Sequence, residues 1–152
     1  MVTTDTIKEL RDSTGVSVMQ CKSALEEAGG DKEKALAILK KKGVEAALEK
    51  SDRNLNAGII ASYIHGTGTI GVMVELACET DFVSKNSEFK QLAYDIAMHI
   101  AASKPESGSV LLEQPFIKNP EITVGALINS AIQKFGEKTE IVRFIRYAAL
   151  EK

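Results

Sequence analysis

The stretch GIIASYIHGTGTIGVMVELACETDFV, residues 58–83, decides the fold of this chain. Its second half alternates between apolar and other side chains along residues 70–78, which is the period of a strand with one buried face. The glycine-rich turn at residues 66–68 predicts that residues 58–65 pair with that strand as a β-hairpin. These glycines lack the Gly-Lys-Ser/Thr sequence and the following helix of a phosphate-binding loop, so we interpret them as a turn.

The sequence after this hairpin changes to a helical period. Apolar side chains recur at i, i+3, i+4, i+7 and i+8, which predicts an amphipathic helix over residues 86–103. Residues 103–120 contain all three prolines and are expected to form a loop, with one extended piece around residues 110–112. A second amphipathic helix is predicted over residues 123–135. Residues 139–150 are rich in β-branched and aromatic side chains and are predicted to add a third strand to the hairpin.

The first 50 residues carry only helical signals, and they predict three helices. Ser17 and Gln20 form a capping box at the start of the second helix. Asp31 is expected to cap the third helix, which should stop at Gly43 directly after three lysines that suit a helix C-terminus. A further helical stretch is predicted over residues 44–50.

Together these signals predict an α+β chain with two domains. Residues 1–50 should form a three-helix bundle, and residues 51–54 should form a polar linker. Residues 55–152 should form a three-stranded antiparallel sheet packed with helices.

Composition excludes several classes of function. The 152 residues are 44% apolar and 26% charged, which is typical of a packed globular protein. Nineteen Lys and Arg against 21 Asp and Glu leave a net charge of -2, so direct nucleic-acid binding is not expected. Asp5 and Glu9 stand where a signal peptide would be apolar, and no apolar run approaches the roughly 20 residues of a membrane span. We therefore expect no membrane segment and a cytoplasmic location.

The sequence shows no convergent catalytic or metal-binding set. His65 lies beside the glycine turn and His99 lies off the apolar stripe of its helix, so both are interpreted as surface histidines. Cys21 and Cys78 lack the spacing of a zinc site or of a disulfide framework, so no metal and no cofactor are expected. An enzyme that uses Cys78 is a weak alternative, because that thiol falls on the buried face of its strand with no histidine beside it.

Two apolar residues stand at unusual positions. Met19 falls nearly opposite the buried stripe of its helix, near Lys22, and should be exposed. It is either one of the single exposed apolar residues common on surfaces or part of a contact. Phe82 lies in the connector TDFV, residues 80–83, between the most regular strand and the most regular helix. It either folds back onto the core as a staple or projects to meet a partner.

Residues 75–85, ELACETDFVSK, closely resemble the TDFV signature of the elongation factor Ts family. Residues 10–25, LRDSTGVSVMQCKSAL, resemble a second signature of the same family. The resemblance covers nearly all of the chain. There are two departures: Ala77 replaces the usual Asn or Val, and residues 103–110 form a short bridge where typical members carry several tens of additional residues, largely helical.

The resemblance implies a non-enzymatic guanine nucleotide exchange factor for elongation factor Tu, in its GDP-bound and nucleotide-free states. The N-terminal module of the family resembles a ubiquitin-associated three-helix bundle and docks on the GTP-binding domain of that partner. Lys8, Met19 and Lys22 match its contact positions.

The resemblance also assigns a role to the connector, whose residues are Thr80, Asp81, Phe82 and Val83. The Asp81 and Phe82 pair is expected to reach the GTPase domain near its Mg²⁺ site, with Phe82 wedged between helices. Their displacement would disturb Mg²⁺ and the phosphate loop and let GDP escape. The competing hypothesis is an interaction module of the same fold with reduced or lost exchange activity.

The sheet further predicts a homodimer. The face away from the predicted helices carries Met73 and Ala77, and the last strand is apolar on both faces, with Ile141, Ile145 and Tyr147 on one and Val142, Phe144 and Leu150 on the other. Both faces therefore favour burial. Typical long family members supply a second subdomain, whereas this chain has one copy, so a second chain is expected to cover the face around a two-fold axis.

Overall fold

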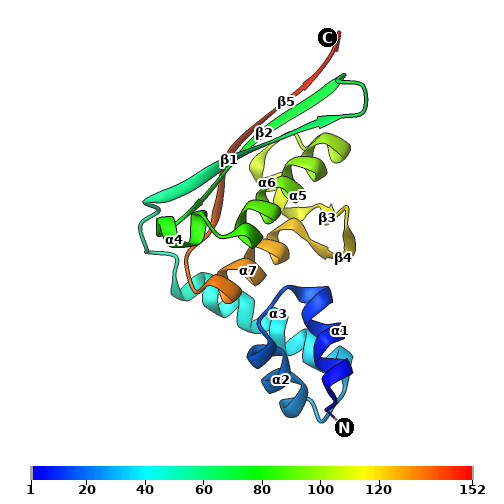
Figure 1. Ribbon diagram of the computed structural model, residues 1–152, viewed down its shortest axis with the longest axis vertical. Helices are drawn as coiled ribbons and strands as arrows, with labels where there is room; N and C mark the ends of the chain where they lie inside the picture. Colours follow the sequence, from blue (N-terminus) through cyan, green and yellow to red (C-terminus); the bar gives the residue numbers. More distant parts are fainter. Residues whose placement is uncertain (1, 152) are drawn as a thin grey trace. The chain divides into compact units, whose positions relative to one another are not determined.

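The hairpin and the last strand form one antiparallel sheet in the computed structural model, which describes residues 2–151 (Figure 1). Strands β1 (Ala57–His65) and β2 (Ile70–Cys78) pair across the predicted turn, and β5 (Glu140–Ala148) pairs with the other edge of β2. Four alternating side chains of β2 are buried: Val72, Val74, Leu76 and Cys78. The structure confirms the α+β class and the three-stranded sheet.

One face of the sheet is covered by the long helix that the apolar stripe predicted. Helix α5 (Ser87–Ser103) contacts both β1 and β2, and Figure 1 shows it running along the sheet. Its stripe from Phe89 to Ile100 is buried apart from the half-buried Leu92. The short helix α4 (Asp81–Ser84) lies between the end of β2 and the start of α5.

The segment predicted as a loop contains regular structure instead. Helix α6 (Gly108–Glu113) occupies the place of the expected extended piece, and β3 (Pro115–Phe116) pairs with β4 (Asn119–Thr123). The physical reason is capping, because the Ser107 side chain accepts a hydrogen bond from the amide of Val110. Leu111 is fully buried, which further stabilises this turn and a half of helix.

His99 is buried, which contradicts its interpretation as a surface histidine. Its side chain is 1% exposed. The Ile117 amide donates to Nδ1 at 3.1 Å, so the proton of the neutral ring is on Nε2, which donates to Gln114 Oε1 at 2.9 Å. The segment after α6 therefore covers the face of α5 that carries His99, which the sequence pattern indicated to be exposed. The prediction failed because a fully hydrogen-bonded histidine can stand in a core.

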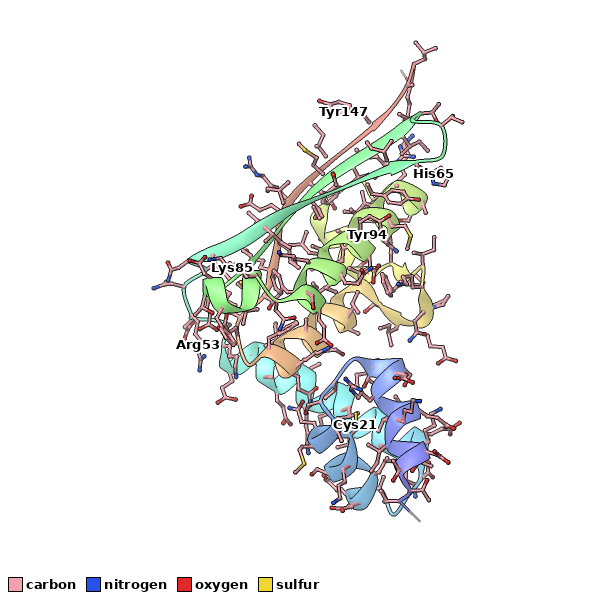
Figure 2. All side chains as sticks on the ribbon, in the orientation of Figure 1. Cys21, Arg53, His65, Lys85, Tyr94 and Tyr147 are labelled. Carbon is pink, nitrogen blue, oxygen red and sulfur yellow. The ribbon has the colours of Figure 1, made fainter. Side chains whose placement is uncertain are left out.

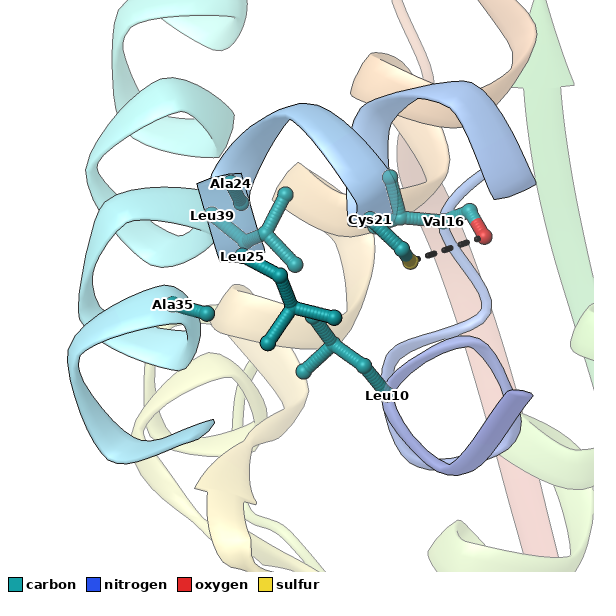
Figure 3. Packing of buried hydrophobic residues seen from close by; sticks show 7 residues of the cluster. All are labelled: Leu10, Val16, Cys21, Ala24, Leu25, Ala35 and Leu39. Atoms are coloured by element: carbon teal, nitrogen blue, oxygen red, sulfur yellow. Dashed lines mark hydrogen bonds between the residues drawn. The ribbon is translucent and has the colours of Figure 1, made fainter. Parts of the chain in front are cut away.

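Three helices form the N-terminal bundle, as predicted. They are α1 (Thr4–Thr14), α2 (Val18–Glu27) and α3 (Lys32–Glu49). Ser17 and Asp31 cap α2 and α3 by accepting bonds from backbone amides. Figure 3 shows the core cluster, which consists of Leu10, Val16, Cys21, Ala24, Leu25, Ala35 and Leu39. Burial raises the pKa of the Cys21 thiol, against smaller lowering effects from Thr14 and Arg11.

Helix α3 does not stop at Gly43, as the sequence predicted, but continues to Glu49. Gly43 is buried in its middle, and a Cβ built there would lie 3.4 Å from Asn129 Cβ and from the Asn129 carbonyl oxygen. Asn129 belongs to helix α7 (Val124–Phe135), the second amphipathic helix that the sequence predicted. The glycine therefore permits a close approach of two helices and does not mark a helix end.

The chain divides into two compact units. The first contains the residues up to Asp52 together with Ala126–Glu137, and the second contains Arg53–Gly125 and the residues from Lys138 onward. Both the predicted domains and these units have a boundary close to residue 52, but residues 126–137 fall within the first unit. The predicted division into domains of residues 1–50 and 55–152 stays a prediction.

The face of the sheet away from α5 is rich in exposed apolar side chains: Ile60, Ile64, Met73, Val142, Ile145 and Tyr147. Ala77 is buried, and a register shift between Glu75 and Leu76 places Ile141 opposite the buried Leu76. Ile141 and Val142 therefore each lie on the face of the sheet opposite to the one predicted, because a bulge breaks the alternation of the last strand.

No helix within residues 2–151 is both long and apolar enough to cross a membrane.

Candidate protein-binding surfaces

The connector after β2 forms a capped single turn of helix. Thr80 has extended backbone angles and its side chain accepts from the Val83 amide, which makes it the N-cap of α4. Val83 and Ser84 are buried at 4% and 3% exposure, and the Ser84 hydroxyl donates to the Asp81 carbonyl at 3.2 Å. The turn is thus held to the protein by its second half.

Phe82 projects from this turn into solvent. Its side chain is 87% exposed, although both Val83 and Ser84 beside it are buried. A staple onto the core would bury the ring, so the structure does not support that interpretation. A large aromatic group on an anchored turn is a favourable contact for a partner, and its role in binding stays a prediction.

Charged side chains fix the base of the connector, and sequence reasoning did not find them. Glu79 accepts from the Arg53 guanidinium at 3.4 Å with one oxygen and from the Lys138 backbone amide with the other. The Cys78 thiol donates to the Thr80 carbonyl at 3.3 Å. Arg53 and Lys85 lie at this end of the second unit in Figure 2. The sequence predicts Arg53 only as part of the polar linker, and its charge is the one feature that could signal this pairing.

The second candidate surface lies on helix α2. Met19 is 73% exposed, and Lys22, one turn further on, is also exposed. Lys8 is exposed on the neighbouring helix α1. Val18, directly before Met19, is 47% exposed, so the apolar part of this surface contains two adjacent side chains. Cys21, Ala24 and Leu25 form the buried side of the same helix.

The geometry offers little for covalent or metal chemistry. Both thiols are buried, and the Cys21 thiol donates to the Val16 carbonyl at 3.6 Å. A reactive cysteine needs an accessible thiolate, whereas burial raises the pKa of Cys21. Within residues 2–151, no three His, Cys, Asp or Glu side chains gather as a metal site would require. His65 is exposed, and its Nδ1 lies 2.9 Å from the Tyr63 hydroxyl.

The exposed face of the sheet forms the third candidate surface. Tyr147 is 70% exposed and lies on the side of the sheet away from α5 in Figure 2. At the opposite end of this face, Gly58 lies opposite Ala77 in the register, and these small residues line a shallow hollow of about 580 Å³. Glu75 and Glu140 bring acidic groups to the hollow, and the Arg143 guanidinium donates to Glu75 at 2.8 Å.

A family model described as Elongation factor TS matches residues 12–109 of this chain. Elongation factor Ts of Carboxydothermus hydrogenoformans is 44% identical over 192 aligned positions, which cover 97% of this chain and 88% of that relative. Elongation factor Ts of Desulforamulus reducens is 43% identical over 186 positions, covering 93% of this chain and 86% of the relative. Elongation factor Ts of Thermodesulfovibrio yellowstonii is 41% identical over 190 positions, which cover 96% of this chain and 95% of that relative.

These relatives contain residues that this chain lacks. The first alignment spans 192 positions whereas the chain has 152 residues, so at least 40 aligned positions have no counterpart here. A shortening of this kind was predicted for residues 103–110. In the structure this bridge is compact, because Lys104 ends α5 in a left-handed conformation and α6 begins at Gly108.

Proposed function

Because this chain belongs to the elongation factor Ts family of translation elongation factors, we propose that it is a guanine nucleotide exchange factor for elongation factor Tu. It binds the GDP-bound partner, promotes release of GDP and remains on the nucleotide-free form until GTP enters. The chain itself makes and breaks no covalent bond in this role. It works in the cytoplasm, where its partner acts.

The observation that carries the proposal is the exposed Phe82 on an anchored turn. Glu79 and Thr80 fix the base of the connector, and the buried Val83 fixes its far side, so Phe82 is presented without a loop that must first be ordered. Pre-organisation lowers the entropy lost on binding. In the proposed mechanism this ring enters between helices of the GTPase domain, and Asp81 beside it acts near the Mg²⁺ site.

Free-energy coupling shows that Phe82 cannot act alone. If the chain weakens GDP binding by some factor, GDP weakens binding of the chain by the same factor. A 10⁴-fold effect needs roughly 5.5 kcal/mol of differential binding. Complete burial of one Phe side chain supplies only about 1.5–3 kcal/mol. The remainder must come from further contacts, for which the α2 surface and the second unit are the proposed sources.

The direct test is release of a fluorescent GDP analogue, mant-GDP, from elongation factor Tu of the same organism. Catalytic amounts of the chain should accelerate release by at least tenfold over the intrinsic rate. Binding without acceleration would favour the alternative of an interaction module that has lost exchange activity with its shortened bridge. No binding in titration calorimetry would exclude elongation factor Tu as the partner.

The α2 surface gives a separate prediction. Met19→Ala and Lys22→Ala should each weaken the complex with elongation factor Tu by about threefold or more, because both side chains are exposed where the contact is proposed. Stability should change by less than about 0.5 kcal/mol, as is usual for surface positions. Titration calorimetry and thermal melts measure the two effects. Wild-type affinity in both variants would remove this surface from the interface.

The exposed sheet face is the proposed homodimer contact. Two copies that pack face to face around a two-fold axis would cover the apolar side chains of β1, β2 and β5 with an isologous contact. Light scattering at micromolar concentration should give about twice the chain mass of 16.4 kDa. A charged substitution, Ile145→Glu, should return the mass to that of one chain. A mass near 16.4 kDa that stays constant on tenfold concentration would refute the dimer.

A further inference from the structure

Helix α7 contacts the same bundle that carries the α2 surface. Its residues from Ala126 onward belong to the first compact unit, although they lie far from α1, α2 and α3 in the sequence. Ile128, Ala131 and Ile132 are buried along one side of it. Within residues 2–151, α7 approaches α3 closely at Gly43 and accepts a hydrogen bond from α2 at Gln20.

The contact with α3 depends on Gly43. A Cβ at this position would lie 3.4 Å from the Asn129 side chain and from its backbone carbonyl. Glycine inside a helix is unfavourable compared with alanine, and α3 continues for six residues beyond it. A glycine at a buried helix position is explained by the close approach of the Asn129 backbone. A larger side chain would have to push the two helices apart.

The contact with α2 is made by Gln20. Its side-chain amide donates to the Gln133 carbonyl at 3.4 Å, and its side-chain oxygen accepts from the Ser17 hydroxyl at 3.1 Å. Gln20 follows Met19 directly and precedes Lys22 by two residues. The half-buried residue that ties α2 to α7 is therefore a direct sequence neighbour of Met19 in the surface proposed to bind elongation factor Tu.

We infer that α7 completes the partner-binding module as a fourth helix, and that Gly43 and Gln20 are positioning residues for the α2 surface. The inference rests on the proposed function, because it assigns the two residues to the orientation of Met19 and Lys22. They act through α7, and neither needs to touch the partner. A change that displaces α7 should then weaken binding to the partner, with a smaller effect on the step in which GDP is released than the loss of Phe82 has.

The test compares three variants of the full chain in the mant-GDP assay. Gly43→Leu should raise the concentration that gives half-maximal exchange about fivefold or more, which corresponds to roughly 1 kcal/mol, and should lower the maximal rate by less than Phe82→Ala does. Ala37→Leu places the same side chain at an exposed position of α3 and should match wild type. Gly43→Ala should restore most of the affinity, because its Cβ needs only a small adjustment at 3.4 Å.

A double-mutant cycle separates positioning from general damage. Gly43→Leu combined with Met19→Ala should weaken binding by less than the product of the two single effects, because displaced α7 already misplaces Met19. If Gly43→Leu does not fold, Gln20→Ala takes its place with the same expected pattern. Full additivity, or half-maximal concentrations equal to wild type in both variants while Met19→Ala weakens binding, would overturn the inference.

Amide hydrogen exchange tests the inference independently of exchange activity. In Gly43→Leu, amides of α2 and of residues 126–135 should lose protection together by about tenfold or more, since both belong to one cooperative unit. Unchanged protection in α2 while α7 opens would also overturn it. If the wild-type chain fails to accelerate mant-GDP release, the proposed function fails, and hydrogen exchange still reports whether α7 holds α2.

Discussion

Phe82→Ala is expected to slow the GDP release promoted by the chain by roughly 10- to 100-fold. The ring is 87% exposed, and its burial in the partner supplies about 1.5–3 kcal/mol of free energy. Each loss of about 1.4 kcal/mol lowers the rate of GDP release tenfold. The loss should appear in the maximal rate of mant-GDP release, because the ring acts on the helices that hold the nucleotide. The stability of the variant should stay within about 0.5 kcal/mol of wild type.

A matched control removes an exposed apolar side chain from the other unit. Leu48 is 70% exposed on α3, so Leu48→Ala should leave both exchange and stability unchanged. Thermal melts of the two variants complete the comparison. Unchanged exchange in Phe82→Ala, together with a drop of several degrees in melting temperature, would instead mean that Phe82 packs on the core in solution.

His99→Ala is expected to destabilise the fold by about 3 kcal/mol. The substitution leaves the Ile117 amide without its acceptor at Nδ1, removes the donor to Gln114 and opens a cavity at a 1% exposed position. An unsatisfied buried group costs about 1–3 kcal/mol, and the cavity adds to this cost. For a chain of this length the melting temperature should fall by roughly 10 °C.

The second histidine is the control for this experiment. His65 is exposed at the end of β1, where its contact is with the Tyr63 hydroxyl. His65→Ala should change stability by less than about 0.5 kcal/mol. Equal melting temperatures of the His65→Ala and His99→Ala variants would show that the buried hydrogen bonds of His99 contribute nothing.

The parts of the fold with a strong hydrophobic period were predictable from sequence. Residues 70–78 and the stripe of α5 follow periods of 2 and 3.6, because each packs one face against a single core. The prediction that α3 ends at Gly43 was wrong, because a glycine that follows lysines is also a common signal for the end of a helix. Only the position of Asn129, 86 residues later in the chain, shows that the glycine permits a helix contact.

The position of the candidate site could be predicted from the sequence, but the contacts that hold it in place could not. The sequence placed Phe82 in a connector and Met19 opposite a buried stripe, and both are exposed. Whether Phe82 folds back onto the core depends on whether the tertiary packing around α4 leaves room for the ring. A local sequence pattern carries no information on that packing. The pairing of Glu79 with Arg53 and the Lys138 amide joins three separated segments, so no periodicity could reveal it.

The order of strands in the sheet has a consequence for synthesis on the ribosome. The central strand β2 pairs on one edge with β1, its immediate predecessor, so the hairpin can close as soon as both arms have left the exit tunnel. Its other edge pairs with β5, where Leu76 meets Ile141 and Gly71 meets Tyr147. That edge stays open until β5 has been made. The nascent protein therefore presents an unpaired β2 edge throughout the translation of α4 to α7, and during this interval it is most exposed to strand pairing with other chains.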